Sequence, residues 1–274
     1  MPTLEEIRSE LHSLRNPKKA EQSKNYLKSP YNFYGITVPQ LRKIAKKHKN
    51  LTIYETFNLF DELWNSGNHE EMCIALFLLT NHKKQFSLEF WNFLTKPERL
   101  NKFKTWDHVD EASSHTLGVI LAENAQLNSQ IKEFSQSKNT WVRRISIVSQ
   151  YQSIKKGKIQ LTILLAEKLC NDEDIYVQKG TGWMLREAAK KNPVQIKEFI
   201  KIHKDMKPWC LSYATEKMPE FKKLIKEQLK QEEIEKELKQ QQKLVEQELR
   251  QQQNNKPVAN ISAEELGKIK YFKN

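Results

Sequence analysis

Apolar residues recur at helical spacing along most of the chain. Phe57, Phe60 and Trp64 step by three and four residues, which places them on one face of a helix. Thr-x-x-Glu or Thr-x-x-Gln segments precede such patterns and predict capped helix starts at Thr3, Thr37 and Thr52. The apolar run 72–80 predicts a buried helix. Because no segment shows strand-like alternation between hairpin turns, the sequence predicts an all-α fold.

A weak internal repeat gives this helical pattern a period of 35 residues. Trp106, Trp141 and Tyr176 lie 35 residues apart, and each stands at the start of a segment with a similar order of apolar, basic and small positions. A unit of this length fits a pair of helices, and stacked pairs form an α-solenoid. The sequence therefore predicts a superhelix of HEAT-like repeats, with units shorter than the usual HEAT repeat.

The composition changes after Phe221 and divides the chain in two. Residues 222–253 are nearly all Lys, Glu and Gln, and Gln241 and Glu248 occupy positions where a coiled coil needs apolar d residues. We therefore expect a repeat domain over 1–221 and a charged, helical C-terminal extension over 222–274. The extension is a candidate docking element for a partner whose identity the sequence leaves open.

The charge is strongly positive, and most of it belongs to the predicted repeat domain. Of the chain's 46 basic and 34 acidic residues, 34 and 25 precede Lys222. A basic excess on a folded surface fits a polyanion such as nucleic acid, although lysines on solvated helix faces explain it equally well. Glycine and proline are scarce, at 7 and 9 of 274 residues, which agrees with long helices.

The cysteines and the N-terminus bear on the cellular compartment. Cys73, Cys170 and Cys210 are far apart and show neither a disulfide framework nor zinc-ligand spacing. The first residues lack the basic and apolar regions of a signal peptide, and no apolar run reaches the length of a membrane span. We expect a soluble intracellular protein, in the cytoplasm or, in a eukaryote, in the nucleus.

The segment Trp106-Asp107-His108-Val109-Asp110 is the first candidate for chemistry. If it opens a helix, Trp106 and Asp110 share a face and place an indole beside a carboxylate. The simpler interpretation makes Asp107 an N-cap, Asp110 a favourable charge in the first turn and Trp106 a core residue. Taken alone, this segment favours the simpler interpretation.

Two later segments carry basic residues at the starts of repeat helices. Arg143 and Arg144 follow Trp141, and one of them could clamp a phosphate, or form a salt bridge between neighbouring repeats. Gly180 and Gly182 interrupt the next helix, where they permit close helix packing or leave space beside Trp183. Lys179, Trp183 and Arg186 lie there on adjacent turns.

Taken together, these segments resemble the AlkD-like family of DNA alkylation repair glycosylases. The resemblance covers roughly residues 4 to 220. It rests on blocks that occur in the family's order: 34–45 (Tyr-Gly-Ile-Thr-Val-Pro-Gln-Leu-Arg-Lys-Ile-Ala), 106–110, Trp141-Val142-Arg143-Arg144, and 182–187 (Gly-Trp-Met-Leu-Arg-Glu) with Lys191-Asn192-Pro193. The extension after Phe221 is not part of the family core.

The resemblance implies a superhelix whose concave basic face holds duplex DNA, and an enzyme that excises N3- and N7-alkylated purines. By motif, the catalytic aspartate is Asp110, and the two tryptophans that flank the lesion's sugar are Trp106 and Trp183. Arg144 corresponds to the family's nearby basic residue, with Arg143 the second choice. The resemblance also implies that the damaged base stays stacked in the duplex.

This chemistry is self-consistent. A cationic alkylpurine leaves without a general acid, so the enzyme must stabilise a sugar with oxocarbenium character, which a carboxylate and indole faces can do. Arg144, Arg143, Lys179 and Arg186 are the candidate DNA-binding residues that would hold phosphates. We expect no metal and no cofactor, because no zinc-ligand cluster or glycine-rich phosphate loop is present, and we assign no role to His108.

Two other functions stay open at this point. One is a non-catalytic protein that binds distorted or branched DNA, which an Asp110 buried in a salt bridge away from the groove would favour. The other is a protein-interaction scaffold, a common use of helical solenoids. In each case we expect a monomer.

Overall fold

The computed structural model describes residues 2–254 and consists of helices and short connections. It separates into two compact units, Met1–Lys222 and Lys223–Asn274, which we describe separately. Part of the predicted C-terminal extension, 255–274, lies outside the described residues. Within the described part no strand is present, and one isolated bridge pairs Asn32 with Asn68. The predicted all-α, helical-repeat fold is confirmed.

The helices of the first half are α1 (Pro2–Ser13), α2 (Pro17–Leu27), α3 (Val38–Lys47), α4 (Ile53–Trp64), α5 (His69–Asn81), α6 (Leu88–Leu94), α7 (Pro97–Leu100), α8 (Trp106–Ala112) and α9 (Gly118–Glu123). A π-helical turn, Ser113–Leu117, joins α8 to α9, and 3-10 turns occupy Lys83–Gln85 and Ala125–Leu127. The second half holds α10 (Asn128–Phe134), α11 (Thr140–Val148), α12 (Tyr151–Lys155), α13 (Gln160–Leu169), α14 (Ile175–Ala189), α15 (Pro193–Ile202), α16 (Pro208–Ala214) and α17 (Pro219–Asn254).

Local sequence explains many of the helix starts. Thr37 with Gln40 and Thr52 with Glu55 form the capping boxes predicted for α3 and α4, because each side chain bonds the backbone or side chain of the other. The first predicted box is wrong, since Thr3 lies inside α1. The predicted buried run coincides with α5, in which nearly every side chain is buried.

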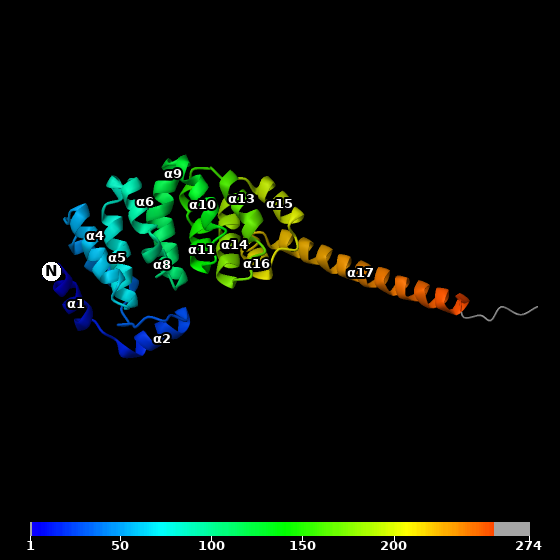
Figure 1. The fold of residues 1–274 in the computed structure, drawn as a ribbon, viewed down its shortest axis with the longest axis horizontal. Helices are drawn as coiled ribbons and strands as arrows, with labels where there is room; N and C mark the ends of the chain where they lie inside the picture. The colour runs from blue at the N-terminus through cyan, green and yellow to red at the C-terminus, as the bar shows by residue number, and fades with distance from the viewer. Residues whose placement is uncertain (1, 255–274) are drawn as a thin grey trace, which may run out of the picture. The chain divides into compact units, whose positions relative to one another are not determined.

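The helices stack in the order of the chain within the first unit. Helices α5, α8, α11, α14 and α16 each contact the next, and the shorter helices α10 and α13 pack against α11 and α14. Figure 1 shows this succession as a row of helices, with α2 lying below it near α5 and α8. Trp106 is the first residue of α8, while Trp141 and Tyr176 are the second residues of α11 and α14, so the 35-residue period marks equivalent helix starts.

Gly182 permits a close contact between α14 and α16. A Cβ atom at this position would lie 2.4 Å from the carbonyl oxygen of Cys210 and 2.7 Å from the Cβ atom of Tyr213, both on α16. Any larger residue would therefore push α14 and α16 apart. This is the close helix packing that the glycine predicted.

In the second unit the structure describes the C-terminal part of α17, residues 223–254. Helix α17 starts within the first unit at Pro219, runs to Asn254, and carries mainly exposed side chains where these are described. Exposed Ile234, Leu238, Leu244 and Val245 are among its few apolar residues. In the described part of the chain, no helix combines the length and the apolar character that crossing a membrane requires.

Candidate functional site

Helix α8 presents the first two predicted site residues. Trp106 opens the helix, and Asp110 follows one turn later on the same side. Both side chains are partly exposed. Tyr26 of α2 lies edge-on to Trp106, with ring centroids 6.2 Å apart, and is 74% exposed. Tyr26 thus adds a second solvent-accessible aromatic ring next to Trp106.

The π-helical turn follows Asp110 almost directly. Residues 106–123 form one continuous helix whose middle, Ser113–Leu117, is wound more loosely than its ends. Such turns are rare and occur often at functional sites. Gly118 permits this stretch to pack closely, because a Cβ atom there would lie 2.6 Å from the carbonyl oxygen of Ser149 at the end of α11. The helix carrying Asp110 is thereby held against the next repeat.

Asp110 forms a two-pronged ion pair with Arg144 of α11. The Nε and one terminal nitrogen of Arg144 each donate to a separate carboxylate oxygen, both at 2.9 Å. The remaining terminal nitrogen donates to the backbone carbonyl of Tyr176 on α14. Arg144 therefore ties three consecutive repeat helices together at the predicted catalytic residue.

The two members of this pair differ in their access to solvent. The side chain of Arg144 is 6% exposed and that of Asp110 is 18% exposed. Burial raises the pKa of Asp110 above its ordinary value, while the attraction of Arg144 opposes this rise. Arg144 therefore fixes the orientation of the Asp110 carboxylate, and this carboxylate is the more solvent-exposed member of the pair.

Helix α14 carries the second predicted tryptophan. Trp183 is partly exposed and lies 5.8 Å from the ring of Tyr151 on α12, centroid to centroid. Gly180, nearly one turn earlier, leaves room for Arg144, since a Cβ atom there would lie 3.0 Å from the guanidinium. The two glycines of α14 thus have separate effects, Gly180 beside Arg144 and Gly182 against α16.

The other predicted DNA-binding residues each have a partner within the protein. Arg143 makes a two-pronged pair with Asp172, at 2.6 and 3.0 Å, and bonds the carbonyl of Ser137. This is the salt bridge between neighbouring repeats that the sequence offered as an alternative. The ammonium group of Lys179 lies over the ring of Trp209 at 4.3 Å. Arg186 pairs with Glu187 and Glu216. Their contacts with DNA stay a prediction.

Comparison with known proteins identifies the family. The family model described as DNA alkylation repair enzyme matches residues 7–218, which is most of the chain. The chain belongs to this family. Among solved structures, it is similar to a predicted DNA alkylation repair enzyme from Enterococcus faecalis, with a TM-score of 0.63 and 22% identity over 74% of this chain and 96% of that one. No match is found among curated proteins.

The first turn of α8 differs from the simpler interpretation of its sequence, in which Asp107 is the N-cap residue. Thr105, not Asp107, is the N-cap residue. Asp107 lies inside the helix, and its Oδ2 atom is 2.9 Å from Nε2 of His69 on α5. Burial alone would raise the pKa of Asp107, but hydrogen bonding from His69 and the nearby histidines hold it well below its usual range. An ionised side chain thus anchors the start of the helix that presents Trp106 and Asp110.

A buried cluster lies behind this contact. His69 is stacked between Phe33 and His108, with centroid distances of 4.4 and 4.2 Å, and its Nδ1 atom is 3.7 Å from the thiol of Cys73. Burial lowers the pKa of His108 to about 3 and raises that of the Cys73 thiol well above its ordinary value. Sequence reasoning missed this cluster, because His69 and His108 are 39 positions apart and no local pattern reveals their contact.

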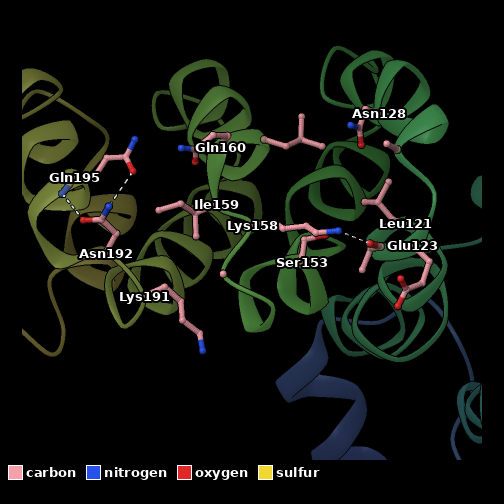
Figure 2. Close-up of a pocket in the computed structure, with 14 residues that line it drawn as sticks. Leu121, Glu123, Asn128, Ser153, Lys158, Ile159, Gln160, Lys191, Asn192 and Gln195 are labelled. Carbon is pink, nitrogen blue, oxygen red and sulfur yellow. Dashed lines mark hydrogen bonds between the residues drawn. The ribbon is translucent and has the colours of Figure 1, made fainter.

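A surface cavity of about 660 Å³ opens elsewhere on the first unit, between the end of α9 and the starts of α13 and α15. Figure 2 shows Asn192 and Lys158 at its edge, where Asn192 caps α15 by accepting from the backbone of Gln195. Lys158 donates to the carbonyl of Ala122. None of the predicted site residues lines this cavity, so it is separate from the candidate site.

Proposed function

We propose that this protein is a DNA glycosylase that excises cationic N3- and N7-alkylated purines from duplex DNA by hydrolysing the N-glycosidic bond. The observation that carries the proposal is the Asp110–Arg144 pair, whose more open member is the carboxylate. Trp106 stands one turn away on α8, and Trp183 lies on α14, the helix to which Arg144 also bonds. The repair domain of the proposal is residues 1–221.

The reaction requires little beyond these groups. The alkylated base is already positively charged and leaves with the bonding electrons, so the developing cation is on the sugar. Asp110 stabilises this charge and orients a water molecule toward the anomeric carbon. As the water oxygen bonds to that carbon, Asp110 accepts the proton and later releases it to solvent. The indole faces of Trp106 and Trp183 attract the same cation.

Arg144 acts in this proposal as a positioning residue. Its two bonds hold both carboxylate oxygens, and its third bond fixes it to α14. Preorganised charge is effective because it needs no rearrangement when the transition state forms. Lys179 and Arg186 supply positive charge for the phosphates on either side, and Arg143 does so less because Asp172 engages its charge, which fits duplex DNA as the partner.

The direct experiment measures base release from duplex DNA treated with a methylating agent. The parent protein is expected to release 7-methylguanine and 3-methyladenine, and Asp110→Asn is expected to lose this activity while still binding DNA. Untreated duplex DNA is the control and should yield no free base. Equal release by the parent and Asp110→Asn would overturn the assignment of the carboxylate.

A second function is favoured by the same ion pair. Both carboxylate oxygens of Asp110 accept hydrogen bonds from Arg144. A carboxylate engaged in this way fits a protein that recognises the structure of DNA without cleaving the N-glycosidic bond. This alternative predicts salt-sensitive binding to duplex DNA and no base release by the parent or by Asp110→Asn. The release assay and a binding titration, performed on the same preparations, therefore separate the two functions.

A further inference from the structure

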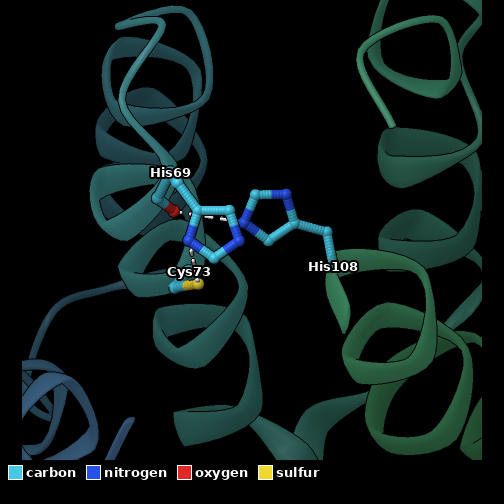
Figure 3. Close-up of side chains that lie close together, drawn as sticks. All are labelled: His69, Cys73 and His108. Atoms are coloured by element: carbon cyan, nitrogen blue, oxygen red, sulfur yellow. Dashed lines mark hydrogen bonds between the residues drawn. The ribbon is translucent and has the colours of Figure 1, made fainter. Parts of the chain in front are cut away.

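Three side chains that have no role in the proposed reaction meet between α5 and α8. His69 and Cys73 lie four residues apart on one side of α5, and His108 reaches them from α8. One ligand atom from each lies within 4.8 Å of the other two, and all three side chains are buried. Figure 3 shows the two imidazole rings facing each other with the thiol beside His69. We propose that His69, Cys73 and His108 bind one zinc ion.

The spacing of the first two ligands matches that ion. In a tetrahedral zinc site with usual bond lengths, a sulfur and a nitrogen ligand are about 3.6 Å apart. Nδ1 of His69 and Sγ of Cys73 are 3.7 Å apart. An ion can therefore lie between these two atoms without a shift of α5.

His108 supplies the third ligand after a turn of its ring. In the present arrangement the ring stacks on His69, and its Nε2 atom is 3.1 Å from the backbone oxygen of His69. Its Nδ1 atom is buried without a hydrogen-bond partner. When the side chain of His108 rotates, it loses its hydrogen bond to the backbone oxygen of His69 and gains a bond to the zinc ion.

Asp107 is not one of the three proposed ligands, but it contacts the ligand His69. Its carboxylate is 2.9 Å from Nε2 of His69, the ring nitrogen that points away from Cys73. Histidines that bind metals commonly direct their second nitrogen to a carboxylate, which fixes the ring and its tautomer. A proton on Nε2 facing Asp107 leaves the lone pair of Nδ1 directed at the ion.

The ligand types select the kind of ion. A thiolate with two imidazoles suits zinc and excludes magnesium and calcium, which take oxygen ligands. The thiol of Cys73 gives up its proton to solvent when the sulfur binds, so binding of one ion releases one proton. The bound ion would link α5 to α8 behind the turn that carries Trp106 and Asp110. With three protein ligands, a water molecule would take the fourth tetrahedral position, and the ion would brace α5 against α8 because it lies among buried side chains.

The test is a zinc titration of the full chain after chelator treatment, followed by calorimetry, with cobalt as a spectroscopic substitute. We expect one equivalent of zinc to bind and raise the melting temperature, and cobalt to give a thiolate charge-transfer band. Cys73→Ser should remove the band and weaken zinc binding by more than about 100-fold, whereas Asp107→Asn should weaken it by about 10- to 100-fold. Cys170→Ser, which changes another buried thiol, is the matched control and should bind as the parent does.

The proposal is overturned if the parent binds no stoichiometric zinc, or if Cys73→Ser binds it as tightly as the parent. Thermal melting without metal shows whether each variant folds. If Cys73→Ser does not fold, His108→Gln decides, and an unchanged zinc affinity in that variant also overturns the proposal. None of these results depends on base release, so they test the metal site independently of the glycosylase proposal.

Discussion

Two neighbouring arginines of α11 make similar ion pairs in different surroundings. Arg144 holds Asp110 of the preceding repeat helix, and Arg143 holds Asp172 in the connection before α14. In the first pair the arginine is the more buried member, at 6% against 18% exposure. In the second it is the carboxylate, at 8% against 19%.

This difference suggests separate roles for the two pairs. A carboxylate that is the open member of its pair can meet a ligand, whereas one that is the buried member chiefly joins protein segments. Asp172 also accepts from the backbone nitrogen of Asp174, which caps α14. We infer that the Arg143–Asp172 pair is purely structural, whereas the Arg144–Asp110 pair joins three helices and in addition serves the reaction. The predictions below test this contrast, beginning with the largest expected effect.

Removal of the two arginines should affect stability unequally. Arg144→Ala removes a buried side chain that joins three helices and leaves the largely buried Asp110 without its cation, so it should lower the free energy of unfolding by about 3–5 kcal/mol. Arg143→Ala should cost less, about 1–3 kcal/mol, because its partner retains a backbone hydrogen bond. Urea unfolding of both variants gives the comparison. Equal losses would remove the distinction between the pairs.

The two glycines of α14 should respond differently to a methyl group. Gly182→Ala forces a contact with the backbone of α16 and should destabilise the domain by about 1–3 kcal/mol. Gly180→Ala meets the movable end of Arg144, so its stability should change little while base release falls. Melting curves and release rates measured together check this. Full activity in Gly180→Ala would show that the placement of Arg144 matters little.

The pH dependence of release should report the Asp110 carboxylate. Its pKa is raised by burial, so the ionised form should be lost as pH falls, at a midpoint above the ordinary value of about 3.9. Arg144→Gln removes the opposing cation and should move the midpoint upward by about one unit or more. Release without enzyme is subtracted at each pH. A midpoint that stays the same in Arg144→Gln would point to another titrating group.

The smallest effect is expected at Lys179. This residue pairs with an aromatic ring, not with an acid, so its charge is available to a phosphate. Lys179→Gln should weaken binding to all duplexes alike and reduce the slope of log affinity against log salt by about one. Arg143→Gln is the comparison, since its charge is engaged by Asp172, and its slope should change less.

Local patterns in the sequence predicted the parts of the fold that local forces determine. The capping boxes at Thr37 and Thr52, the buried helix α5 and the 35-residue recurrence of helix starts are all present. Each depends on residues within one or two helical turns, or on a repeated unit. The placement of Trp106 and Asp110 on one side of α8 follows from the same periodicity.

Local sequence patterns could not predict contacts between segments that lie far apart in the chain. Thr105 is the N-cap residue of α8, while Asp107 contacts His69, 38 residues earlier in the chain. Tyr26 gave no signal, because a single tyrosine in a lysine-rich helix has no periodic partner. The residue pattern alone left open which of Arg143 and Arg144 would face Asp110. The family resemblance favoured Arg144, and the structure pairs Arg144 with Asp110.

The most direct test of the central claim is single-turnover release from a duplex with one 7-methylguanine, at enzyme concentrations that saturate the DNA. Saturation removes differences in binding, so the rate reports the chemical step. The account predicts that Asp110→Asn slows this step by about 10²- to 10⁴-fold, while Asp172→Asn, measured as folded protein, stays close to the parent. Similar rates for the parent and Asp110→Asn, or an equal loss in both variants, would contradict it.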